Sequence, residues 1–214
     1  MAKFGLACEG ITDQIVIENI LFGFYDKYDD LDDKIQPFQP AYDETDKKQK
    51  EGEFGGWEML LQYLSEERFR DDVLNSEYTI IQIDTDISEH KNFNVKIDTS
   101  SIENYISNIR DKIINFIDKK EKFYNLNKDK IIFAISVHSL ECWILPIYKT
   151  LTTEKILNCD KALEIASTKI KVNKNYNTYN KLTKLFLKKK NLDKFYSQNK
   201  SFTIFINSLP KTID

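Results

Sequence analysis

Cysteines and long apolar runs are both scarce in this sequence. Its three cysteines, Cys8, Cys142 and Cys159, form no C-x-x-C pair, which argues against a disulfide framework and against a zinc site. Each cysteine is flanked by apolar residues, so we expect buried thiols. No apolar run is long enough to cross a bilayer, and no signal-peptide pattern opens the chain. We therefore expect a cytoplasmic protein that makes no membrane contact.

Acidic residues are almost absent from the C-terminal part of the chain. Residues 169–211 contain eleven lysines and a single acid, Asp193, although the whole protein has a net charge of −3. This separation of charge can present a cationic surface to a polyanion. A lysine-rich helical tail can equally be an ordinary solvated surface, and the sequence leaves both interpretations open. The candidates for phosphate contacts are Lys184, Lys188, Lys189 and Lys190.

The remaining composition is that of a globular protein with a substantial core. Of the 214 residues, 41% are apolar and 30% are charged. Four segments rich in β-branched and aromatic residues predict strands, and helical patterns lie between them. The predicted strands cover residues 4–8, 35–42, 77–86 and 130–137. Two prolines confine the second of them to a sheet edge or a distorted segment.

This alternation of strands and helices predicts an α/β fold. Over residues 1–150 we expect a mostly parallel, Rossmann-like sheet with helices on both faces. Residues 151–214 are interpreted as a helical, basic extension of that domain. Most of the polar stretch 26–56 is expected to be a mobile loop, and a helix is expected over 57–74.

Side-chain caps are predicted for three helices. Thr12 can cap the first helix, whose first turn carries Asp13. Ser100, with Glu103 three residues later, matches a capping box. Asp160 can cap a helix over residues 161–168.

Three acids follow predicted strands. Glu9 comes after the first strand, and Asp84 and Asp86 end the third. Parallel strands place all their carboxyl ends at one edge, so the three carboxylates can meet if the strands are neighbours. Such a cluster is stabilised by a cation, and all-oxygen ligation suits Mg²⁺ or Mn²⁺. Strand-end acids are also common as solvated loop residues.

These residues carry a family resemblance. Glu9-Gly10-Ile11-Thr12-Asp13 after a strand, followed by Asp84-Thr85-Asp86 after a later one, resembles the Toprim domain. That domain is shared by primases, topoisomerases, small RNA-maturation nucleases and the overcoming-lysogenization-defect (OLD) family of phage-defence nucleases. The resemblance implies that Glu9 is a general acid/base or metal ligand, and that Asp84 and Asp86 bind Mg²⁺. Ile87-Ser88-Glu89 departs from the small residues that often follow the second aspartate.

The segment after the fourth strand offers two more candidates. His138 and Glu141 are three residues apart and share a face if the segment is a helical turn. It resembles the corresponding segment of small Toprim proteins, which implies a proton shuttle at His138 and a further ligand at Glu141. A buried, hydrogen-bonded pair beside Trp143 is the alternative interpretation.

The resulting hypothesis is a metal-dependent nuclease acting on DNA or RNA, tRNA included. The resemblance implies an effector of bacterial anti-phage defence that acts with a partner such as an ATPase or sensor subunit. A homo-oligomer is compatible with the sequence, which does not determine the oligomeric state. One alternative is a non-catalytic Toprim-like interaction subunit. The other is a receiver-like domain with Asp84 as phosphoacceptor. Receivers, however, pair acids after the first strand and need a lysine after the fifth, and neither feature is evident in this sequence.

Overall fold

A four-stranded parallel sheet forms the centre of the computed structural model, which describes residues 2–40, 56–98, 100–151, 154, 156–168 and 170–213. The strand order is β2-β1-β3-β4, and every neighbouring pair is parallel. The strands are β1 (Ala2–Ala7), β2 (Ile35–Gln39), β3 (Ser76–Asp84) and β4 (Ile131–Ser136). The predicted α/β class and parallel sheet are therefore confirmed, and β2, which contains Pro37, lies at an edge.

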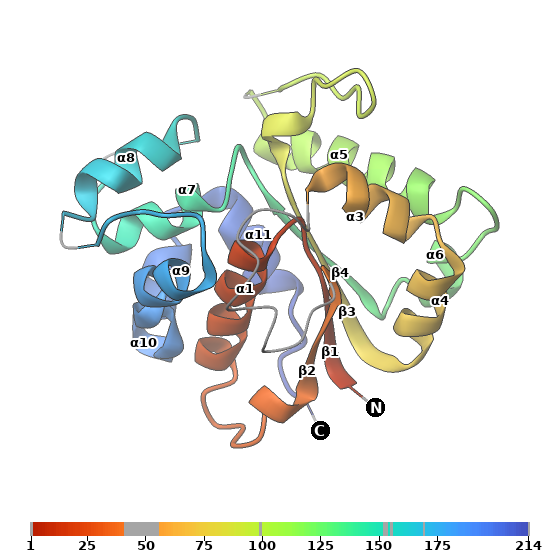
Figure 1. The fold of residues 1–214 in the computed structure, drawn as a ribbon, viewed down its shortest axis with the longest axis horizontal. Coiled ribbons are helices and arrows are strands. Elements are labelled where there is room, and N and C mark those ends of the chain that lie inside the picture. The colour runs from red at the N-terminus through yellow and green to blue at the C-terminus, as the bar shows by residue number, and fades with distance from the viewer. Residues whose placement is uncertain are drawn as a thin grey trace.

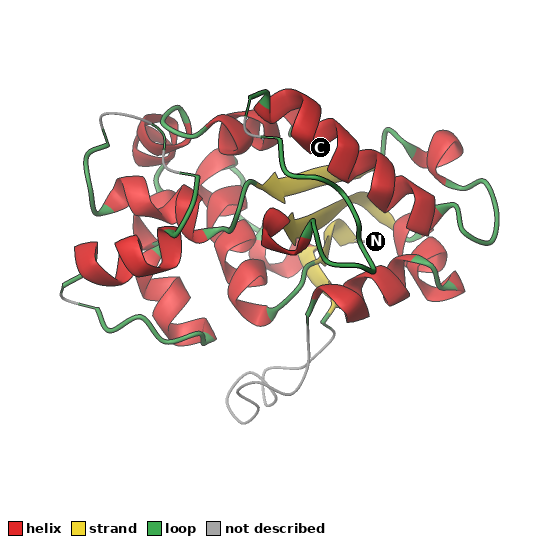
Figure 2. Ribbon diagram, turned by 90° about the horizontal axis from the view of Figure 1, so that it is seen from above, coloured by secondary structure: helices red, strands yellow, loops and turns green. Residues whose placement is uncertain are grey.

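Helices cover both faces of this sheet. One layer contains α1 (Ile11–Phe24) together with α7 (Glu141–Ile144), α8 (Cys159–Ala166), α9 (Tyr176–Leu182), α10 (Lys189–Tyr196) and α11 (Lys200–Ser208). The other contains α3 (Trp57–Leu64), α4 (Glu67–Leu74), α5 (Ile102–Ile117) and α6 (Tyr124–Asn127). Figure 1 shows the two layers on either side of the strands, and Figure 2 shows the same arrangement from above.

The first layer is built around α1, which is apolar almost all round and nearly completely buried. The C-terminal helices pack on this helix and on β4. Trp143 stacks on Phe202 of α11 with ring centroids 4.7 Å apart, and its indole nitrogen donates to Ser201 Oγ at 2.8 Å. Asn19 of α1 donates to Thr183 Oγ1 at 2.7 Å. Residues beyond 150 therefore share one core with the sheet.

The second layer buries a separate core on the opposite face of the sheet. Phe69 and Val73 of α4 and Tyr105 and Ile109 of α5 are at most 1% exposed. They pack with the apolar residues of β3 and β4 that point to this side. Both faces of the sheet are thus covered, as expected for parallel strands with near-continuous apolar sequences.

Several helix ends differ from the sequence predictions. The first helix begins at Ile11 with Gly10 in the capping position, and no side chain caps it, so the Thr12 cap is wrong. Helix α5 is capped by Ser101, whose Oγ accepts from Asn104 N–H at 3.3 Å. Ser100 instead donates to Asp98, which removes it from the capping role.

Two further helix predictions need correction. The segment 57–74 forms two helices, α3 and α4, because residues 65–66 are not helical and separate them. Helix α8 begins at Cys159 after Asn158, which has a left-handed φ of 51°, so Asp160 lies inside its first turn rather than at the cap. Most of the expected loop within 26–56, residues 41–55, lies outside the described residues.

The cysteines depart most clearly from expectation. Cys142 and Cys159 form a disulfide with a sequence separation of 17, while Cys8 is a buried free thiol as predicted. The pairing arises because α7 and α8 pack together and bring the two Cα atoms within 5.0 Å. No C-x-x-C spacing announces such a contact.

None of the described helices combines the length and the hydrophobicity that a membrane span requires.

Candidate active site

The carboxyl edge of the sheet brings Glu9 and Asp84 into contact. Asp84 is the last residue of β3, and Glu9 follows the neighbouring strand β1. Glu9 Oε1 accepts a hydrogen bond from the Asp84 backbone N–H at 2.7 Å. The two strand-end acids therefore meet at the carboxyl edge of the sheet, as parallel neighbours allow. The carboxyl ends of the strands point upward in Figure 1.

The Asp84 carboxylate is held by a set of donors. Its Oδ1 accepts from Gln82 Nε2 at 2.9 Å and from the Leu140 backbone N–H at 3.2 Å. Ser136, its register partner on β4, also donates its hydroxyl to this oxygen. Gln82 is fully buried, and its Oε1 faces the Glu9 backbone N–H at 3.4 Å. Asp84 is consequently fixed in orientation by β3, β4 and the turn after β4.

Asp86 lies on a short 3₁₀ turn, Thr85–Ile87, because β3 ends at Asp84. The strand alternation assumed from the sequence therefore stops before Asp86. Its backbone N–H donates to His138 O at 3.0 Å, and the His138 N–H donates to Thr85 Oγ1 at 2.7 Å. These two bonds tie the segments that follow β3 and β4 together beside the acids.

His138 and Glu141 belong to different local structures. Helix α7 starts only at Glu141, and His138 precedes it with a φ of 65°, so the shared helical turn predicted from the sequence is wrong. Glu141 is 5% exposed and accepts from the hydroxyl of Tyr179 on α9. His138 lies beside Asp86, and its Nδ1 is buried with no hydrogen-bond partner among the described residues.

Burial and mutual repulsion raise the pKa values of the acids. Burial, then the nearby Asp13, raises the pKa of Glu9 to about 8. Burial, then Glu141, raises the pKa of Asp13 to about 7. Burial and Glu9 hold the pKa of Asp84 well above its usual range. Loss of hydration also raises the pKa of Asp86, although His138 and Lys174 oppose this shift.

Several residues at this edge are not among the sequence candidates. Asp13, expected only to favour the helix dipole, faces Glu9 and Glu141. Lys174 interacts favourably with Glu9, Asp13 and Asp86 from the segment before α9. The four-residue spacing from Glu9 to Asp13 across the Gly10 turn is a signal that the sequence does offer. Nothing in the sequence marks Lys174 or Tyr179.

The oxygen atoms of the clustered acids suit a hard divalent cation in type and in charge. They are carboxylate oxygens whose mutual repulsion a cation relieves. As the side chains stand, however, no three His, Cys, Asp or Glu residues of the described chain are grouped so that they could hold a metal ion. Binding of Mg²⁺ or Mn²⁺ would therefore require side-chain rotation, for which the partly exposed Glu9 and the exposed Asp86 have room.

The lysines predicted to bind phosphate lie elsewhere. Lys189 sits over the Phe24 ring at 4.3 Å and pairs with Asp193 at 3.8 Å. Phe24 ends α1, whereas Asp13 lies in its first turn, and the helix is about 20 Å long. Lys184, Lys188 and Lys190 are exposed on the neighbouring turn and helix. Lys174 is instead the lysine whose positive charge acts on the acids.

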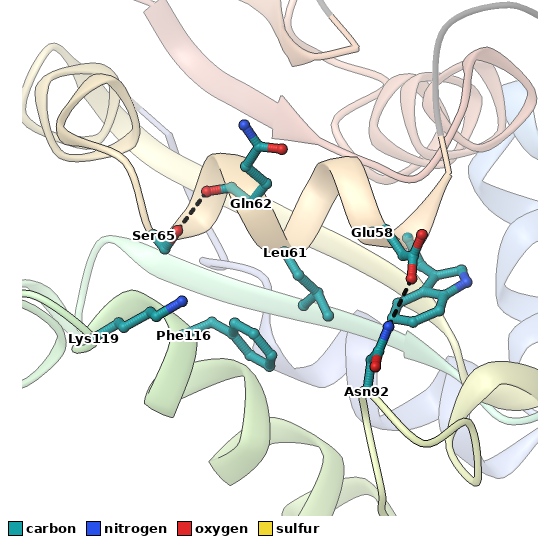
Figure 3. Close-up of a pocket in the computed structure, with 8 residues that line it drawn as sticks. Glu58, Leu61, Gln62, Ser65, Asn92, Phe116 and Lys119 are labelled. Atoms are coloured by element: carbon teal, nitrogen blue, oxygen red, sulfur yellow. Dashed lines mark hydrogen bonds between the residues drawn. The ribbon is translucent and has the colours of Figure 1, made fainter.

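A separate hollow of 230 Å³ lies between α3 and α5 (Figure 3). Its polar contacts are local: Asn92 donates to Glu58 at 3.0 Å, and Ser65 donates to the Gln62 carbonyl at 2.7 Å. None of the clustered acids lines it. We therefore place the candidate active site at the sheet edge and not in this hollow.

Fold and site together define an α/β protein with a parallel sheet and a cluster of acids at its carboxyl edge. Comparison of the chain with protein-family models, curated proteins and solved structures gives no significant match. The proposed function therefore rests on the site and on the Toprim resemblance of the sequence.

Proposed function

We propose that this protein is a metal-dependent nuclease that hydrolyses phosphodiester bonds in DNA or RNA. The observation that carries the proposal is the contact between Glu9 and Asp84, 2.7 Å from carboxylate oxygen to backbone nitrogen, at the ends of adjacent parallel strands. Ligand sites of open α/β sheets lie at this edge. The Toprim resemblance of the segments 9–13 and 84–86 supports the same reaction class.

The cation would be held by Glu9, Asp84 and Asp86, with Asp13 and Glu141 near enough to contribute charge. When bound, Mg²⁺ or Mn²⁺ polarises phosphate oxygens and activates water. Asp84 is the fixed member of the set, because donors from two strands and a turn orient it. Asp86 and Glu9 are the adjustable members.

Proton transfer can be assigned to the chain's own groups. In the metal-free chain the pKa of Glu9 is raised to about 8, which suits a general acid or base near neutral pH, whereas Glu9 would be ionised when it serves as a ligand of the cation. Lys174 supplies positive charge at the same edge and is placed to attract a phosphate. The more distant lysines 184 and 188–190 would contact the nucleic-acid backbone outside the site.

The resemblance to phage-defence nucleases extends the proposal to the cell. The protein would act as a defence effector with a partner such as an ATPase or sensor subunit. A non-catalytic interaction subunit is the rival function, and it requires the same acids only for folding or for cation binding.

Cleavage of labelled DNA and of total tRNA tests this proposal. Wild-type protein is incubated with Mg²⁺, Mn²⁺ or EDTA and compared with Asp84→Asn and Asp86→Asn. We expect metal-dependent cutting that falls about 100-fold or more in both variants. Asp71→Asn, an exposed acid on α4, is the matched control and should cut normally.

Cutting that survives in Asp84→Asn would contradict the assigned site. Absence of cutting by folded wild-type protein on every substrate would favour the interaction subunit. In that case Glu9→Ala should leave partner binding or a defence phenotype intact.

A further inference from the structure

A small hollow of 190 Å³ adjoins the acid cluster on the side of Asp86 and His138. Its floor is formed by Val137 and Tyr105, which are 3% and 1% exposed. The Tyr105 hydroxyl is already engaged with Ser88 Oγ at 2.6 Å, so the ring offers mainly its apolar surface. The hollow is thus an apolar recess beside charged groups.

Two exposed apolar side chains stand at this hollow. Ile97, from the loop before α5, is 40% exposed, and Leu157, from the segment before α8, is 48% exposed. These two residues are far apart in the sequence and face one recess together with Ile156. Apolar side chains left in water at a recess favour a ligand with apolar surface.

The polar side chains at the hollow include Asp86 and His138, from the segments that follow β3 and β4. His138 has a left-handed backbone and a buried Nδ1 with no hydrogen-bond partner among the described residues, and it lies next to Asp86. His138 Nδ1 itself has no accessible surface, so a ligand would meet the rest of the imidazole, which lines the hollow beside Asp86. The recess therefore combines apolar walls with the polar side chains of His138 and Asp86.

A nucleobase has this combination of properties. Its faces are apolar and stack on side chains, while its edge carries hydrogen-bond donors and acceptors. The recess shares Asp86 with the acid cluster, so a nucleotide whose phosphate lies at the acids has its base within reach of Ile97 and Leu157.

We propose that this hollow, lined by Ile97, Val137, His138, Ile156 and Leu157, binds the nucleobase next to the scissile phosphodiester. This inference rests on the proposed nuclease function and adds a substrate subsite to it. Because the His138 imidazole can donate or accept according to its tautomer, the recess accepts more than one base.

The direct test compares adenosine 5′-monophosphate with ribose 5-phosphate, binding each to the full chain in Mg²⁺ by calorimetry or NMR titration. Both probes carry the same sugar and phosphate, so the ratio of affinities isolates the base. We expect at least tenfold tighter binding of the nucleotide. The ratio should approach one in Ile97→Asp and Leu157→Asp, whose added charge lies in the recess.

Leu74→Asp is the matched control, because Leu74 is 52% exposed and lies on α4 outside the hollow. It should retain the wild-type ratio. If either aspartate variant fails to fold, Leu157→Ala should still reduce the ratio severalfold. Equal binding of the two probes, binding of neither, or a ratio unchanged in the recess variants would overturn the inference.

The readout also separates this inference from the proposed function, since nucleotide binding requires no cleavage. Base-dependent binding without nuclease activity would keep the subsite and reject the nuclease. Metal-dependent cleavage with a ratio of one would keep the nuclease and reject the subsite.

Discussion

At the scale of single residues, burial and the charges around Glu9 set the pKa of its carboxyl. Burial raises this pKa most and Asp13 raises it further, while the Asp84 backbone N–H and Lys174 lower it. The Asp84 carboxylate accepts hydrogen bonds from Gln82 on its own strand and from Ser136 on β4, which hold it in place. The acids are therefore kept close together at an energetic cost that a proton or a cation relieves.

The raised pKa values predict how stability depends on pH. Glu9 and Asp13 bind protons more tightly in the folded chain than at their ordinary values of 4.5 and 3.8. The folded state therefore holds more protons, and the free energy of unfolding should fall as pH rises from about 5 to 8. Chemical denaturation across this range measures it, and Glu9→Gln should flatten the fall while Glu67→Gln, an exposed acid, should not.

Binding of a divalent cation should stabilise the folded state, as protonation of the acids does. We expect Mg²⁺ to raise Tm more at pH 8 than at pH 5, because the carboxylates are charged only at the higher pH. Equal stabilisation at both pH values would show that the ion binds outside the cluster.

At the scale of elements, the placement of α1 decides where the site and the C-terminal helices lie. The helix starts directly after Glu9 and Gly10, and its opposite end reaches Phe24. Gly23, near the C-terminal end of the helix, allows the turn before α10 to approach. A Cβ built on Gly23 would lie 1.7 Å from the backbone oxygen of Phe186.

Gly23→Ala should therefore destabilise the protein although alanine is the better helix former. Helix propensity alone predicts a gain of about 1 kcal/mol. The clash with a backbone atom should outweigh it and cost about 1–3 kcal/mol overall, measured by urea denaturation. Asn115→Ala, an exposed position on α5, is the matched control and should be neutral or slightly stabilising. A stabilised Gly23→Ala would refute the close contact.

At the scale of the whole molecule, the C-terminal third is joined to the sheet by apolar packing and by hydrogen bonds. Phe202 stacks on Trp143, and Tyr179 reaches Glu141 at the site. The disulfide between Cys142 and Cys159 adds a covalent link between α7 and α8. Because Cys142 follows Glu141 directly, this link also restrains the acidic edge.

Reduction of the disulfide should lower stability measurably. Opening a loop of 17 residues costs about 3 kcal/mol, which corresponds to a fall in Tm of roughly 6–12 °C. Thermal unfolding with and without a reductant measures this difference. The double variant Cys142→Ser/Cys159→Ser should unfold at the lower temperature and show no response to reductant. An unchanged Tm of the reduced wild type would show that the link adds no stability.

The sequence by itself determined the α/β class, the four parallel strands and the edge at which Glu9 and Asp84 meet. These features follow from local patterns: β-branched runs such as 77–83, the helical periodicity of α5, and the rule that parallel strands end at one edge. The sequence did not decide which residue caps α5. Ser100 and Ser101 carry the same hydroxyl group, and the hydrogen bond from Ser100 to Asp98 leaves Ser101 as the cap.

Only the tertiary structure decided the rest of the site and the pairing of the cysteines. The C-terminal helices pack on α1, whose first turn carries Asp13, and this packing brings Lys174 and Tyr179 to the acids. Cys142 meets Cys159 through the contact of α7 with α8. Such contacts join residues distant in the chain through the packing of whole helices, and local propensity and periodicity carry no information about that packing.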